Sequence, residues 1–191
     1  MSRRLAELFL IGVVIALIGD AGHVQSGITE YLWDLPAIWK SAIWFPFLVG
    51  GGVAFGGWLG GRLGLARRAH DRRDAYIAAA LVLGLYCLTS LVADAAQIPA
   101  NAICWAVAVA IWLWWDASPP AFCFALAVMV IGPVAEIVMV ELGASRYLPG
   151  HDQLLGVAPW LLPLYFATGA VLSGLWDALA VTDGRSKGLR G

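Results

Sequence analysis

The chain has 191 residues, of which 61% are hydrophobic and only 13% are charged, and its formal net charge is −1. A soluble globular domain carries roughly 25% charged residues, so the composition excludes a soluble domain. We therefore predict an integral membrane protein that forms one all-α domain over residues 1–191, and we expect no nucleic-acid partner.

Six apolar stretches, taken in chain order, are each long enough to cross a bilayer, which requires about 20 apolar residues in a helix. Their approximate bounds are residues 6–24, 41–62, 74–94, 98–115, 120–141 and 158–180. The first stretch follows Arg3 and resembles a secretory signal, but Glu7 and Asp20 fit that pattern poorly. We therefore expect a retained first span and a polytopic protein with six transmembrane helices.

The basic residues indicate how these spans are oriented. If the N-terminus is cytoplasmic, all of the 12 Lys and Arg residues except Lys40 and Arg146 fall on the cytoplasmic side. Cytoplasmic loops carry an excess of Lys and Arg, so we predict that both termini are cytoplasmic. We interpret the arginine-rich segment 62–73 as a determinant of this topology, and His70 within it as a solvated side chain.

The second span, 41–62, is unusually rich in glycine. Three of its glycines, together with Gly64 just beyond it, recur every four residues and therefore lie on one face of a helix: Gly52, Gly56, Gly60 and Gly64. Small residues at this spacing let membrane helices approach closely. We therefore predict that this span is the central packing helix, and exposed small-residue faces also allow a homo-oligomer.

A metal site is one interpretation of the polar residues near the non-cytoplasmic ends of the spans. Asp20 with His23, and His151 with Asp152, could meet there, and two histidines with carboxylates can hold zinc. Neither pair belongs to a specific motif, and the three cysteines have no metal-like spacing. We expect no metal, while this alternative stays open.

Glu136 is the ionisable residue that lies deepest in the predicted membrane region. Ionisable groups in hydrocarbon are costly, so each is a functional candidate. Pro133 precedes Glu136 by less than one turn and lacks an N–H, which predicts a kink. No Lys or Arg in any span can pair with Glu136, so we expect a neutral acid that donates a hydrogen bond. Its expected partners are water, Asn101, Gln97 or a ligand hydroxyl.

Polar residues gather on the non-cytoplasmic half of the predicted bundle, around Glu136. They predict a cavity that opens outward, apolar below and hydrogen-bonding above, which suits an amphipathic lipid. The predicted ligand-binding residues are Glu136, Asp94, Gln97, Asn101 and Pro133. We expect the hydroxyl or ester of the lipid to lie near Glu136. The alternative is that these residues are helix caps and interface residues.

Four motifs occur in an order that is typical of one family. Trp44–Pro46 enters the glycine-rich span, Asp94–Gln97 forms a short acidic-amide turn, Leu113–Asp116 closes the fourth span, and Trp160–Pro163 enters the last span. Together these motifs resemble those of the insulin-induced gene (Insig) proteins, six-span membrane proteins that sense sterols. The resemblance covers about residues 41–180.

The resemblance implies an intramembrane lipid pocket, and it implies that Asp116 binds a partner protein. Animal members bind an oxysterol within the membrane and retain the escort protein of a sterol-regulated transcription factor. Here Ser118, Pro119 and Pro120 follow Asp116 where the family usually has an Arg- and Ser-rich stretch. We therefore expect the fold and the lipid pocket to carry over, and not the regulatory circuit. The composition and the short loops look prokaryotic, which predicts a bacterial cell membrane, or the endoplasmic reticulum if the source is eukaryotic.

Three functions remain open from the sequence. The first is a non-enzymatic sensor or regulator that binds a sterol, a diacylglycerol or a similar neutral-headed lipid. The second is a membrane enzyme that acts on a lipid or isoprenoid, and the third is a small transporter. We favour the first because no complete catalytic set is visible, and we expect no catalytic residue and no cofactor. A transporter usually has paired broken helices in related halves, and only one kink is predicted.

Overall fold

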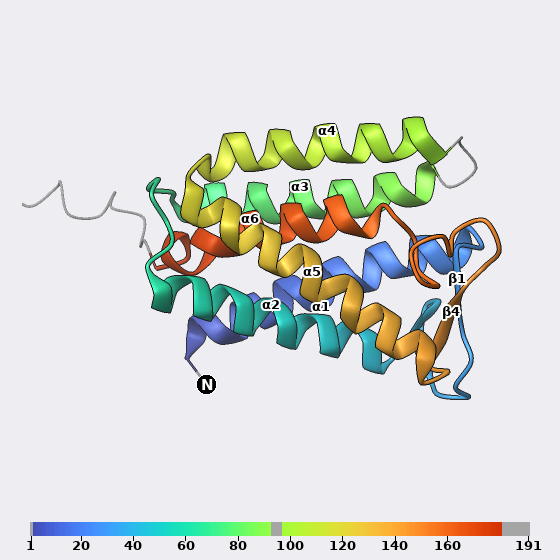
Figure 1. Ribbon diagram of the computed structural model, residues 1–191. Helices are drawn as coiled ribbons and strands as arrows, with labels where there is room; N and C mark the ends of the chain where they lie inside the picture. The colour runs from blue at the N-terminus through green and yellow to red at the C-terminus, as the bar shows by residue number, and fades with distance from the viewer. Residues whose placement is uncertain (1, 93–96, 181–191) are drawn as a thin grey trace, which may run out of the picture.

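The computed structural model describes residues 2–92 and 97–180. Asp94 and the side chain of Gln97 lie outside the described residues. The helices are α1 (Arg3–Gln25), α2 (Trp44–Leu63), α3 (Arg72–Leu91), α4 (Gln97–Asp116), α5 (Pro119–Glu141) and α6 (Leu161–Ala178). They pack as a bundle (Figure 1). The predicted all-α fold is confirmed, and every predicted span boundary lies within three residues of a helix end.

Five of the helices in the described part of the chain are long and apolar enough to cross a membrane: α1, α3, α4, α5 and α6. The exception is α2, because its glycines and tryptophans lower the mean hydropathy. It is nevertheless 20 residues long, as α3 is, and it runs alongside α1 in the bundle (Figure 1). We therefore count α2 as the sixth span on its position in the fold.

Short sequence signals determine where several helices begin and end. Asp71 caps α3 by accepting a 2.9 Å hydrogen bond from the backbone N–H of Asp74, and the Asp74 side chain accepts one from the Asp71 N–H. Ser118 caps α5, whose first residue Pro119 needs no N–H at that position. Helix α2 is capped at its C-terminal end by Gly64, whose φ of 61° is left-handed, a conformation that glycine adopts without strain.

The central helix of the bundle is α6, of which 72% of residues are buried. It packs against α2, α3, α4 and α5. The prediction that the glycine-rich span is central is therefore wrong. The glycine repeat is only partly used for packing. A Cβ at Gly52 would have no atom of another helix within 4 Å, whereas a Cβ at Gly60 would lie 2.7 Å from the carbonyl oxygen of Leu172 on α6. A repeat of small residues shows that a face can approach a neighbour, but it does not show which helix is surrounded.

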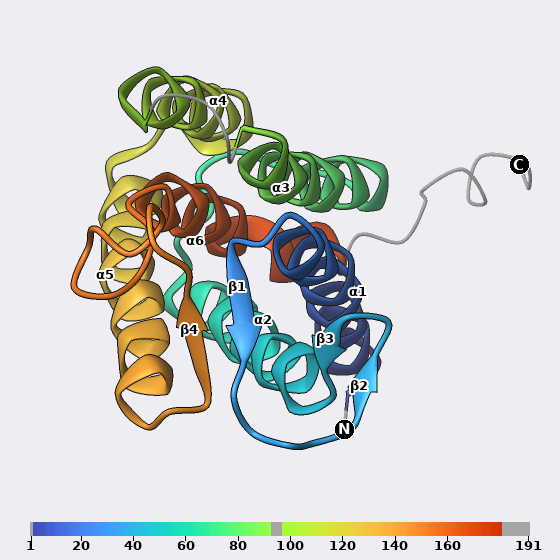
Figure 2. The same ribbon diagram turned by 90° about the vertical axis from the view of Figure 1, so that its right-hand side faces the viewer.

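Short strands join two connections at one end of the bundle. Strand β1 (Thr29–Tyr31) follows α1 and pairs antiparallel with β4 (Ser145–Tyr147), which follows α5. A second pair, β2 (Ala37–Ile38) with β3 (Ser41–Ala42), lies before α2. Figure 2 looks onto this end, where β1 and β4 lie side by side over the helix ends. These strands were not predicted, and they close this end of the bundle.

Candidate functional site

A group of polar side chains lies beneath the β1–β4 pair, where α1 ends. It surrounds a cavity of about 10 Å³, which is roughly the room that the centre of one water molecule or hydroxyl group needs. We call the residues that line this cavity the polar cluster: Asp20, His23, Thr29, Tyr31, Phe45, Tyr86, Glu136, Ser145 and Tyr147. The cluster thus joins α1, α2, α3 and α5 to the two paired strands.

Glu136 reaches the cluster from α5 and has a partner within the chain. Its Oε1 accepts a 2.9 Å hydrogen bond from the hydroxyl of Tyr165 on α6. The Tyr165 ring lies against Gly132, where a Cβ would overlap it. Glu136 therefore acts as an acceptor in this contact, and not as the donor expected from the sequence. Gly132, one turn before the acid, is the sequence signal that a neighbouring group can pack closely there.

Asp20 and His23 lie in the last turns of α1, and each has its own hydrogen-bond partner within the chain. Asp20 Oδ2 accepts a 2.6 Å hydrogen bond from the hydroxyl of Tyr31 on β1. The Nε2 atom of His23 lies 2.7 Å from the hydroxyl oxygen of Thr89 on α3, and its ring packs edge-on against Tyr86 and Trp160. Both side chains are almost fully buried. Among the described residues, no group of three or more His, Cys, Asp or Glu side chains could hold a metal ion.

Tyrosines supply the hydrogen-bond donors of this site. The chain has five tyrosines, and Tyr31, Tyr86 and Tyr147 line the cavity, while Tyr165 holds Glu136. Burial, together with the Asp20 carboxyl, raises the pKa of Tyr31 far above its usual value. Burial and Glu136 likewise raise the pKa of Tyr147. These phenols remain protonated, so they can donate to a carboxylate or to a ligand oxygen.

One polar atom of the cluster is left without a partner. The hydroxyl oxygen of Thr29 is buried and forms no hydrogen bond with any residue that the structure describes. A buried hydroxyl without a partner costs about 1–3 kcal/mol. The cavity beside Thr29 therefore has room, acceptors and an unused hydroxyl for one small polar group.

The other predicted ligand-binding residues lie apart from the cavity. Asn101 is on α4, which packs against α3 and α6, and it does not line the cavity. Its Oδ1 is buried and has no partner among the described residues. Pro133 is buried within α5, which continues through it. The structure thus brings Glu136 together with Asp20 and His23, and not with Asn101.

Asp116 ends α4 at the opposite end of the bundle, and its carboxylate is used within the chain. It is 3% exposed, and its Oδ2 accepts a 2.7 Å hydrogen bond from the backbone N–H of Arg67. Arg68 donates to the carbonyl oxygen of Trp114 at 2.6 Å. His70, whose side chain is only 9% exposed, lies against Trp115. The prediction of a solvated His70 is therefore wrong, and partner binding by Asp116 stays a prediction.

These features define a helical membrane protein with a buried polar cluster at one end of its bundle. No family model matches the chain. It is 42% identical over 185 residues to the INSIG protein homolog of Mycolicibacterium vanbaalenii. The aligned region covers 95% of this chain and 90% of that protein. The chain belongs to the Insig family.

Two solved structures have the same fold. The crystal structure of MvINS, a mycobacterial Insig homologue from Mycobacterium vanbaalenii, has a TM-score of 0.87 and 40% identity, and covers 94% of this chain and 95% of that chain. A crystal structure of a cross-linked MvINS trimer, formed by a cysteine variant, has a TM-score of 0.86 and 38% identity. The match covers 93% of this chain and 94% of that chain.

Proposed function

We propose that this Insig-family membrane protein binds a neutral-headed lipid, such as a sterol or a diacylglycerol, and acts as a sensor or regulator. The observation that carries this proposal is the cavity of the polar cluster. It is lined by two acids and by protonated tyrosines, and the Thr29 hydroxyl beside it has no partner.

The size and chemistry of the cavity favour an uncharged hydroxyl as the lipid head. A volume of about 10 Å³ admits one oxygen, and not a phosphate with its substituents. A lipid hydroxyl can instead donate to Glu136 and accept from Thr29. The apolar body of the lipid would then extend from this end along the helices.

The wider set of predicted contacts remains part of this proposal. Asn101 and Pro133 lie within helices, and Asp94 and Gln97 stay ligand contacts proposed from the sequence alone. The buried oxygen of Asn101 that lacks a partner supports a polar contact there when a ligand is bound.

We further propose that both termini are cytoplasmic, that the protein resides in a bacterial cell membrane, and that it assembles as a homo-oligomer. The distribution of Lys and Arg supports the orientation. The trimer formed by cross-linked MvINS supports the assembly.

Lipid retention by purified variants tests the proposed function. Parent protein, Glu136→Gln and Glu136→Leu are incubated with dioleoylglycerol or cholesterol in one detergent, and the retained lipid is measured by mass spectrometry. Glu136→Gln keeps the shape and a polar group, so it should keep most of the binding. Glu136→Leu removes the polar anchor and should lose about 1–3 kcal/mol of binding free energy.

Glu141→Leu is the matched control, because Glu141 ends the same helix and is exposed. It should retain lipid as the parent does. Equal retention by Glu136→Leu and parent would show that Glu136 serves only its contact with Tyr165. Retention of neither lipid by the parent would contradict the proposed function itself.

A further inference from the structure

A groove of about 630 Å³ runs between α1 and α3, and none of its lining residues belongs to the polar cluster. This volume lies in the range of ligand pockets, which is about 300–1,000 Å³. Most of its length is apolar and is lined by Leu10, Ile11, Val14, Ile15, Ala80 and Leu83. Leu10 and Val14 are more than half exposed, so the groove opens to the surroundings of the bundle. An acyl chain could lie along it from the membrane side.

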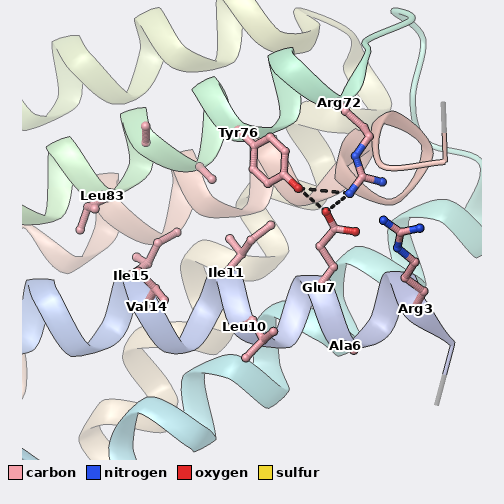
Figure 3. Close-up of a pocket in the computed structure, with 12 residues that line it drawn as sticks. Arg3, Ala6, Glu7, Leu10, Ile11, Val14, Ile15, Arg72, Tyr76 and Leu83 are labelled. Carbon is pink, nitrogen blue, oxygen red and sulfur yellow. Dashed lines mark hydrogen bonds and ion pairs between the residues drawn. The ribbon is translucent and has the colours of Figure 1, made fainter. Parts of the chain in front are cut away.

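The groove ends in a polar network at the start of α1 and α3. Figure 3 shows Arg3, Glu7, Arg72 and Tyr76 gathered there, to the right of Ile11, Val14 and Ile15 of α1. Arg72 forms an ion pair with Oε1 of Glu7, and the hydroxyl of Tyr76 donates to the same oxygen. Arg72 also donates to Tyr76 at 3.1 Å and to the carbonyl oxygen of Leu179 at 3.2 Å. The network therefore concentrates its donors on one oxygen of Glu7.

The second oxygen of Glu7 is left without a donor. This atom, Oε2, is buried and forms no hydrogen bond with any described residue. Leaving a buried charged acceptor unpaired is unfavourable. If the Glu7 side chain turns so that Oε2 faces the groove, a ligand at this end would be stabilised by donating a hydrogen bond to that atom.

The same end carries an excess of positive charge. Arg3 and Arg72 stand beside the single acid Glu7, and Arg3 forms no ion pair or hydrogen bond among the described residues. Guanidinium groups bind phosphate oxygens through charge-assisted hydrogen bonds. The groove thus combines a site for a negative phosphate, an acceptor that needs a donor and an apolar channel.

We infer that this groove binds a phospholipid whose head carries an anionic phosphodiester and a hydroxyl, as phosphatidylglycerol does. The phosphate lies between Arg3 and Arg72, the head hydroxyl donates to Oε2 of Glu7, and an acyl chain follows the apolar side chains of α1 and α3. Glu7 and Asp20 lie on one helix, and 13 residues at 1.5 Å rise separate them by about 20 Å. This site is therefore distinct from the polar cluster, and it takes a different class of lipid.

Comparison of four pure lipids tests the chemistry of the head. Parent protein in detergent is incubated with dioleoyl phosphatidylglycerol, phosphatidylethanolamine, phosphatidylcholine or dioleoylglycerol, and bound lipid is counted by native mass spectrometry. Phosphatidylglycerol should be retained about tenfold better than phosphatidylcholine, which has the phosphate but no hydroxyl or ammonium donor. Equal retention of these two lipids, or a preference for phosphatidylethanolamine, would overturn the inference.

Two variants with matched controls test the place of binding. Arg3→Gln should lower phosphatidylglycerol retention about tenfold, whereas Arg62→Gln, an exposed arginine at the end of α2 that does not line the groove, should not. Ala80→Phe fills the groove and should abolish retention, while Ala127→Phe places the same ring on an exposed position of α5 and should not.

The results separate this inference from the proposed function and from a protein partner. Arg3→Gln and Ala80→Phe should leave dioleoylglycerol retention unchanged, because the polar cluster lies at the other end of α1. Unchanged phosphatidylglycerol retention by Ala80→Phe would show that this lipid binds outside the groove, and the inference would be wrong. If Ala80→Phe instead alters the oligomer size without affecting lipid retention, a second copy of the chain covers the groove and the inference is wrong.

Discussion

The ring of His70 lies flat on the ring of Trp115, with their centroids 3.9 Å apart and an angle of 3° between their planes. The Nε2 atom of the same histidine lies 2.6 Å from the backbone oxygen of Trp115. Together with the hydrogen bond from the Arg67 N–H to Asp116, this contact holds the connection between α2 and α3 against the end of α4. The motif Leu113–Asp116 is therefore part of a structural joint, by which we mean the contacts of Arg67 and His70 with Trp115 and Asp116.

Removal of the Asp116 carboxylate should weaken this joint. Asp116→Ala leaves the N–H of Arg67 without its acceptor, and we expect a loss of about 1–3 kcal/mol in stability. Asp116→Asn keeps a carbonyl oxygen and should lose less. Thermal unfolding in detergent measures both, with the exposed Asp177→Ala as control. A melting temperature for Asp116→Ala equal to that of the parent would leave partner binding as the better explanation of this residue.

A large side chain at a packed glycine of α2 should disrupt its contact with α6. Gly60→Leu places a side chain against the Leu172 backbone, and overpacking typically costs about 1–3 kcal/mol. Gly52→Leu introduces the same side chain on the same helix into open space and should not destabilise the protein. Melting temperature and size-exclusion profile report the difference. Equal behaviour of the two variants would contradict the packing of α2 on α6.

The hydrogen bond between Tyr165 and Glu136 should contribute to stability through both partners. Tyr165→Phe removes the donor and should cost about 1–3 kcal/mol, because a buried carboxyl oxygen then lacks a partner. Glu136→Leu made in the Tyr165→Phe background should cost less than in the parent. A double-mutant cycle measured by thermal unfolding gives the coupling energy. A coupling energy of zero would show that the contact does not stabilise the fold.

Cysteine labelling tests the orientation of the helices. In a background that lacks Cys87, Cys104 and Cys123, single cysteines introduced within residues 66–73 should react from the cytoplasmic side. Cysteines within residues 148–153 should react from the other side, because the two segments lie at opposite ends of the bundle (Figure 1). Labelling of both segments from the same side would be incompatible with this arrangement.

The number and position of the helices could be predicted because the bilayer imposes them. A span needs about 20 apolar residues, and tryptophans mark its ends; these requirements located α4 at 98–115 against the observed Gln97–Asp116. Apolar length also located α5, whose interior Pro133 does not end it.

The partners of the buried acids could not be predicted in this way. Tyr165 meets Glu136, and Tyr31 meets Asp20, only because particular helices and strands are neighbours. Hydropathy along one helix does not specify which other helix it faces. The strands β1 and β4 contain three residues each, which is too short for an alternating pattern. A sequence-based search for partners of Glu136 could still have considered tyrosines, because a phenol donates to a carboxylate without adding a charge.

The pairing of β1 with β4 has a consequence for how the protein is made. Glu30 on β1 and Arg146 on β4 form an ion pair across 116 residues of chain. At a synthesis rate of 5–20 residues per second, the ribosome delivers the second strand on the order of ten seconds after the first. During that interval Asp20 and His23 have left the ribosome without Glu136 or Tyr147. Asp20 can meet Tyr31 early, because only 11 residues separate them, but the polar cluster can be completed only after α5 and β4 have been synthesised.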